Sequence, residues 1–135
     1  METIMNTATR IALSERVQAL SDQHMASWGK MNVLQMISHC ILFEEMTLGK
    51  TKYKQVLLGK LFGKMALRDF MKDKPIRKNT PTAPELIPVL HNESLDQLKT
   101  RWVALLSQYE AFSNHDFIHP FFGKLKAEQI GILAY

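Results

Sequence analysis

The sequence predicts an all-α domain, and three observations support this fold class. Four segments of the chain carry apolar residues at the 3.6-residue spacing of an amphipathic helix. Helix signals border them, of which the clearest are Asn32 followed three residues later by Gln35, and Gly49 at the far end of the same segment. No run of alternating apolar and polar residues with turn chemistry indicates a hairpin. We therefore expect helices without a sheet, in a single domain over residues 1–135.

The first two predicted helices span about residues 9–20 and residues 33–48, the second with Asn32 as its N-cap. Apolar residues lie on several neighbouring rows of the second helix, so most of its surface should be buried. His39 therefore lies on a helix that faces the core. Its neighbour Cys40 is rotated by about 100° around the helix, which favours a buried structural thiol over a site shared with His39.

A basic helix is expected over about residues 54–71. The stretch 50–78 holds ten Lys and Arg against Asp69 and Asp73, so its charge is +8 while the rest of the chain carries −4. Lys60, Lys64 and Arg68 should form a solvated face, with anion or membrane-surface association as a weaker alternative. The residues expected to bury the opposite side are Val56, Leu57, Leu61, Phe62, Met65 and Phe70. The G-x-x-x-G spacing of Gly59 and Gly63 is discounted, because the dimerising motif needs an apolar membrane helix.

The second half of the chain begins with a proline-rich stretch, residues 75–88, which we expect to be a crossover or short lid. A helix from about residue 92 to residue 112 follows, with the clearest apolar stripe in the chain. His119 and Pro120 should form a structural corner, with a role in a substrate pocket as the alternative. A last helix begins near Lys126 and is short, which would leave an apolar groove uncovered. The stripe comprises Leu95, Leu98, Trp102, Leu105, Leu106 and Tyr109.

Composition excludes several classes of protein. Hydrophobic residues make up 46% and charged residues 22% of the chain, as in globular domains rather than disordered chains. Cys40 is the only cysteine, so an intrachain disulfide is excluded. Neither a signal peptide nor a membrane span is predicted, which favours the cytoplasm. We expect no specific nucleic acid as partner, because no aromatic-interleaved motif accompanies the basic residues.

Five segments together carry a resemblance to a known family: residues 28–31 (WGKM), 35–40 (QMISHC), 61–64 (LFGK), 79–82 (NTPT) and 119–125 (HPFFGKL). Through them the chain resembles a branch of unknown function within the DinB/YfiT-like superfamily, from about Ala8 to Tyr135. The resemblance implies a DinB-like four-helix bundle of the up-down type with a long crossover. In this chain the fourth helix would be short.

The resemblance also implies a divalent metal, often nickel or zinc, held by three histidines. His39 matches the ligand of the second helix, and it is the only metal ligand carried over. The other two would form an H-x-x-x-H pair that should follow Tyr135, and no such pair occurs in this sequence. We therefore expect low metal occupancy in this chain.

Two functions follow as hypotheses. The first is a divalent-metal-dependent hydrolase or thiol transferase acting on a small-molecule substrate, with an incomplete metal site and catalytic residues that the sequence does not identify. The alternative is a non-catalytic helical bundle that acts as a binding module and forms a homodimer through the uncovered groove.

Overall fold

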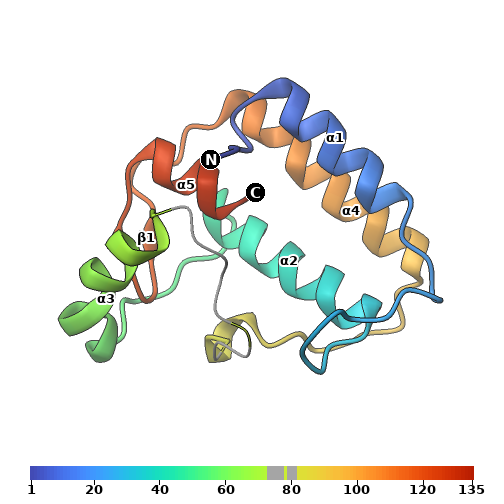
Figure 1. Cartoon of the computed structure of the whole chain (residues 1–135), viewed down its shortest axis with the longest axis horizontal. Helices are drawn as coiled ribbons and strands as arrows, with labels where there is room; N and C mark the ends of the chain where they lie inside the picture. Colours follow the sequence, from blue (N-terminus) through green and yellow to red (C-terminus); the bar gives the residue numbers. More distant parts are fainter. Residues whose placement is uncertain (73–77, 79–81) are drawn as a thin grey trace.

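The computed structural model describes residues 1–72, 78 and 82–135. Over these residues the chain forms five α-helices, two 3₁₀ helices and one two-stranded antiparallel sheet (Figure 1). The α-helices are α1 (Thr7–Gln18), α2 (Val33–Thr47), α3 (Leu57–Phe70), α4 (Leu95–Ser107) and α5 (Ala127–Leu133). The 3₁₀ helices are η1 (Pro84–Leu86) and η2 (Gln108–Ala111), and the strands are β1 (Ile118–His119) and β2 (Gly123–Lys124). The predominantly helical class is confirmed.

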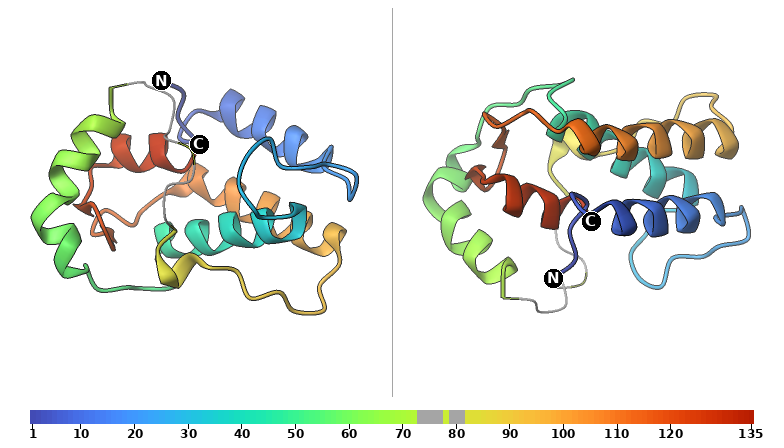
Figure 2. Two further views of the ribbon diagram at one scale, coloured as in Figure 1. Left: turned by 60° about the horizontal axis from the view of Figure 1, so that its bottom comes forward. Right: turned by 90° about the horizontal axis from the view of Figure 1, so that it is seen from above.

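The four-helix bundle is not confirmed. The helix α4 lies between α1 and α2, and these three helices run along one another (Figures 1 and 2). The helix α3 lies apart from them and packs against the strands at the other end of the molecule. Of the predicted crossover, residues 75–77 and 79–81 lie outside the described residues, and residues 84–86 form η1.

Helix α2 begins and ends where its cap residues predict. The Asn32 side chain accepts a hydrogen bond from the Gln35 backbone N–H at 2.9 Å, and the Gln35 side chain accepts one from the Asn32 N–H at 2.9 Å. Gly49 has a φ of 82°, the left-handed conformation that ends many helices. Every residue of α2 is at least partly buried, so the expected burial on several sides is confirmed.

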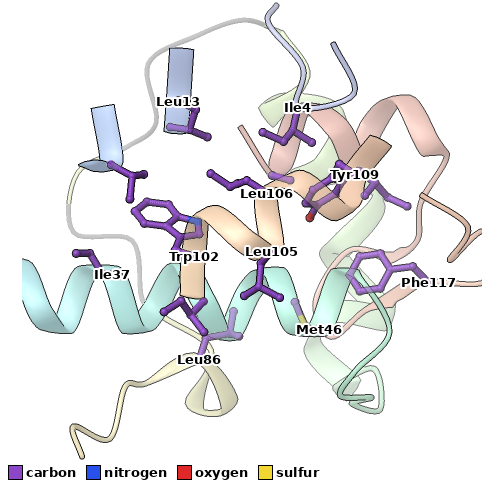
Figure 3. Close-up of a cluster of buried hydrophobic side chains, with 14 of the residues drawn as sticks. Ile4, Leu13, Ile37, Met46, Leu86, Trp102, Leu105, Leu106, Tyr109 and Phe117 are labelled. Atoms are coloured by element: carbon purple, nitrogen blue, oxygen red, sulfur yellow. The ribbon is translucent and has the colours of Figure 1, made fainter. Parts of the chain in front are cut away.

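The predicted stripe of α4 forms the centre of the core. Side chains of α4 lie between Leu13 of α1 and Ile37 of α2 (Figure 3). Trp102 is only 8% exposed, whereas Trp28 in the loop before α2 is 49% exposed. The buried members of the stripe are Leu98, Trp102, Leu105, Leu106 and Tyr109.

Two buried cations connect α1 to its surroundings. The Arg10 guanidinium donates to the carbonyl oxygens of Ile4 and Met5 at 3.1 and 2.8 Å. The Lys99 ammonium of α4 donates to the Leu20 carbonyl just beyond α1 at 3.0 Å. Lys99 lies at the carbonyl-rich C-terminal end of α1, where a cation is favourable. Arg10 instead fixes the residues that lead into the N-terminal end of α1.

The expectation that the fold contains no sheet is wrong. The strands β1 and β2 pair with His119 opposite Gly123. Each has two residues, too few for apolar and polar residues to alternate visibly in the sequence. Nδ1 of the buried His119 accepts hydrogen bonds from the backbone N–H groups of Phe121 and Phe122 at 3.0 and 3.1 Å. The predicted corner at His119 and Pro120 is therefore the turn of this hairpin.

The predicted orientation of α3 is also wrong. The apolar residues expected to be buried are largely exposed, and the buried positions are Gly59, Gly63 and Leu67. A Cβ at Gly59 or Gly63 would overlap the carbonyl oxygen of Phe121. The G-x-x-x-G spacing thus allows close backbone approach, here to the hairpin of the same chain rather than to a membrane partner. Spacing alone could not distinguish the glycine face from the leucine face.

Replacing Gly63 by alanine should detach α3 from the hairpin. The new Cβ would meet backbone atoms of Phe121 and Phe122 that cannot rotate away, and overpacking of this kind costs about 1–3 kcal/mol. Alanine is a better helix former than glycine by about 1 kcal/mol, which offsets part of this cost. Lys64→Ala, at the exposed neighbouring position, should not destabilise, because alanine is also at least as good a helix former as lysine. Chemical denaturation of both variants tests this. Equal stability of Gly63→Ala and the parent protein would contradict the assigned packing.

Candidate functional site

A pocket of about 370 Å³ lies between α2, α4 and the segment of residues 84–93. Leu86 anchors that segment, since its side chain is 5% exposed and points from η1 toward α2 (Figure 3). The apolar lining residues include Ile41, Leu42, Ile87, Val89 and Leu98. The polar lining residues are Ser38, Glu85, His91, Glu93 and Arg101. We refer to this site as the 84–93 pocket.

Charged groups of the 84–93 pocket differ in how well they are paired. Arg101 donates to Glu45 at 2.7 Å and to Glu93 at 3.3 Å, and the Glu45 bond raises the pKa of the guanidinium. Oε2 of Glu85 is shielded from solvent and has no hydrogen-bond partner among the described residues. A buried acceptor without a donor is costly. Glu85 is therefore the group of this pocket most in need of a ligand.

His39 lies beside the pocket rather than in its lining. Its Nδ1 is 2.8 Å from the Leu86 carbonyl oxygen. A carbonyl only accepts, so Nδ1 donates this hydrogen bond. This bond ties α2 to η1 and helps to form the pocket wall.

The structure does not bring the histidines together into a ligand set. His91 lines the pocket, His115 contacts the Phe112 ring, and His119 lies in the hairpin. Over residues 1–72, 78 and 82–135, no group of three or more His, Cys, Asp or Glu side chains is placed to hold a metal ion. The described residues therefore do not fit the three-ligand site that a catalytic metal requires. The role of His39 as a metal ligand stays a prediction.

A buried carboxyl group lies on α2 among the core residues. Glu44 is 2% exposed, and it accepts hydrogen bonds from Tyr109 Oη at 2.5 Å and from Trp102 Nε1 at 3.5 Å. Burial raises the pKa of Glu44 to about 7, although both hydrogen bonds oppose the shift. Burial, together with the nearby Glu44, also raises the pKa of Tyr109.

Two further titratable groups are shifted by burial. The pKa of the Cys40 thiol is raised to about 12 by burial and by the proximity of Glu44. A thiol in this state is a poor nucleophile, which supports the structural role expected for it. Burial lowers the pKa of His119 to about 4, so the ring is neutral at pH 7 and Nδ1 can accept its two hydrogen bonds.

The fold and the site together define a mainly helical domain with a pocket of mixed polar and apolar lining. The family model described as "Protein of unknown function (DUF1569)" matches residues 5–134, and the chain therefore belongs to the DUF1569 family. Comparison with curated proteins and with solved structures finds no match.

The expected membership of the DinB/YfiT-like superfamily is wrong, because the family that matches residues 5–134 is DUF1569. Two of the segments behind that resemblance encode local structure in this fold. Residues 35–40 follow the helix cap at Asn32, and residues 119–125 form the hairpin. Short local elements of this kind recur in unrelated proteins.

Most residues of the pocket, and the buried carboxyl group of Glu44, were not predicted from the sequence. The burial of Glu44 could have been predicted from the sequence. Ile37, Ile41 and Glu44 lie on one face of the helix, where apolar residues are expected, so a carboxyl group there is unusual. No pattern in the sequence indicated that Glu85, Glu93 and Arg101 would lie close together. Their proximity depends on how residues 84–93 pack against α2 and α4.

Glu44 and His119 should give opposite pH dependences of stability. The folded pKa of Glu44 lies above its ordinary value of 4.5, so its contribution is full below that value and is lost as the pH rises through about 7. The folded pKa of His119 lies below its ordinary value of 6.5, so its contribution is full above that value and is lost as the pH falls through about 4. Each change is on the order of 3 kcal/mol.

The pH dependences of stability due to Glu44 and to His119 nearly cancel in the parent protein. Single substitutions should separate them. Between about pH 5 and about pH 6.5, Glu44→Gln should become more stable as the pH rises, and His119→Asn should become less stable. Asparagine can still accept from the hairpin N–H groups. Denaturation at several pH values measures how the free energy of unfolding changes with pH in each variant. If both variants showed the same pH dependence as the parent, the assigned pKa shifts of Glu44 and His119 would be refuted.

Proposed function

We propose that this protein is a ligand-binding domain that takes a small amphipathic molecule with a protonated amine, or a similar N–H donor, in the 84–93 pocket. The observation that carries the proposal is the carboxylate of Glu85, a residue that lines the pocket and whose Oε2 has no donor among the described residues.

The size and lining of the pocket support a small ligand. Pockets for small molecules span about 300–1,000 Å³ and combine an apolar lining with a few polar groups that fix orientation. The 84–93 pocket, at about 370 Å³, lies at the lower end of this range. Its aliphatic residues would cover a short apolar chain, and its polar residues would orient a polar end.

The charges of the pocket favour a cationic ligand over an anionic one. Arg101, its arginine, is already paired with two carboxylates, Glu45 and Glu93, so an anion would have to compete with both. Glu85 has no such partner in the described chain. An ammonium group in the pocket would give the Glu85 carboxylate a charge-assisted hydrogen bond, which is stronger than a neutral one.

Metal-dependent hydrolase or thiol transferase activity lost its support when the family resemblance proved wrong. We therefore favour the non-catalytic alternative of a binding module. The low nickel or zinc occupancy expected for this chain and the homodimer both stay predictions.

The proposal predicts that pentylamine binds more tightly than pentanoate, a chain of equal length with the opposite charge. In two-dimensional ¹H–¹⁵N NMR spectra, pentylamine should shift the signals of Ile41, Leu42 and Ile87. Glu85→Gln keeps the shape but removes the charge, and should weaken pentylamine binding about tenfold. Glu128→Gln on α5 makes the same chemical change at an exposed site outside the pocket and should have no effect.

Two results would contradict the proposal. One is binding of pentanoate as tight as that of pentylamine, because the charge preference comes from Glu85. The other is amine binding that Glu85→Gln and Glu128→Gln weaken equally, because that pattern indicates attraction to the whole protein rather than to the pocket.

A further inference from the structure

Helix α3 carries an exposed apolar face. Leu57, Leu58, Leu61, Phe62 and Met65 are between 46% and 74% exposed. They lie at spacings of three and four residues, which places them together on the helix surface. Monomeric proteins rarely expose apolar groups in such contiguous patches without a binding role.

The orientation of this face is fixed by the fold. Gly59 and Gly63 lie against the backbone of Phe121 and Phe122, and Leu67 is buried on the same side. The apolar residues therefore point away from the body of the molecule. Figure 2 shows α3 at the edge of the molecule, away from α1, in two views, so a large flat surface can approach it.

Basic side chains flank the apolar face. Lys60, Lys64 and Arg68 are exposed along one side of α3, and the exposed Lys52 and Lys54 precede it. Asp69 is the only acidic residue of α3, and it already pairs with Lys72 at 3.0 Å. Helices that lie in the plane of a membrane interface combine an apolar face with flanking Lys and Arg in this way.

We propose that α3 docks this protein onto an anionic lipid surface, with its apolar face among the acyl chains and its cations at the headgroups. A second copy of the chain fits less well, because its α3 would bring more cations and no free carboxylate. No helix in the described part of the chain is long and apolar enough to cross a membrane, so the contact would be peripheral. This inference is independent of the 84–93 pocket.

Co-sedimentation with vesicles tests the proposal on the whole chain. Vesicles of phosphatidylcholine with about one third phosphatidylserine should bind the protein, and vesicles of phosphatidylcholine alone should bind it much less. Binding should weaken as salt rises from low to physiological concentration. Each cation replaced by glutamine at Lys60, Lys64 or Arg68 should lower the partition coefficient about fivefold.

Separate variants test how much the apolar face of α3 contributes to vesicle binding. Leu61→Ser with Met65→Ser changes two exposed residues and should lower the partition coefficient by at least about tenfold. The matched controls are Ile11→Ser with Met25→Ser, and Lys30→Gln with Lys126→Gln, all exposed and outside α3; these should bind like the parent. In a Phe62→Trp and Trp28→Phe variant, tryptophan emission should shift to shorter wavelength when anionic vesicles are added.

Several outcomes would overturn the proposal. The first is absence of binding to anionic vesicles at low salt. The second is binding that charge variants weaken but Leu61→Ser with Met65→Ser does not, because that pattern indicates general polyanion binding without insertion. The third is a dimer in analytical ultracentrifugation that the same double variant dissociates, with no vesicle binding, because the face would then join two copies of the chain.

Discussion

The hydrogen bonds that Trp102 and Tyr109 donate to Glu44 connect the two central helices, and much of the fold depends on this connection. A buried carboxylate is costly unless it is hydrogen-bonded or protonated. Helix α4, with Trp102, and η2, with Tyr109, must therefore present both donors to α2 at one register. With that register set, α1 packs on the far side of α4, and η1 packs on α2 through Leu86 and the His39 hydrogen bond. The 84–93 pocket forms where these elements meet.

Helix α3 is held by a different kind of contact. Its glycines lie against the hairpin backbone, and Leu67 on the same side of α3 belongs to the hydrophobic core. The exposed face of α3 and the 84–93 pocket have no residue in common. A substitution that loosens α3 should affect the exposed face and spare the pocket, and a substitution at Glu44 should act mainly on the packing between α2 and α4.

The sequence predicted the features that depend on local chemistry. The capping residues of α2, the buried stripe of α4 and the corner at His119 follow from short-range patterns, and all three are present. The orientation of α3 could not be predicted, because its leucine face and its glycine face both have helical spacing. Which face is buried depends on the hairpin about 60 residues later in the chain. The pocket was also beyond prediction, since Glu85 and Arg101 meet only through packing. The metal hypothesis failed to gain support for another reason: it rested on family resemblance rather than on a set of ligands within the chain.

The central claim is that the buried carboxyl group of Glu44 joins α2 to α4 and η2 through the hydrogen bonds that it accepts from Trp102 and Tyr109. The most direct test is an NMR titration that follows the side-chain carboxyl carbon of Glu44 in the folded protein. The account predicts a midpoint near the pKa of about 7. The midpoint should be higher in Tyr109→Phe. The Tyr109 hydrogen bond stabilises the ionised carboxylate and lowers its pKa, so removing this bond raises the pKa of Glu44. A midpoint near the ordinary value of 4.5, unchanged by Tyr109→Phe, would contradict the account.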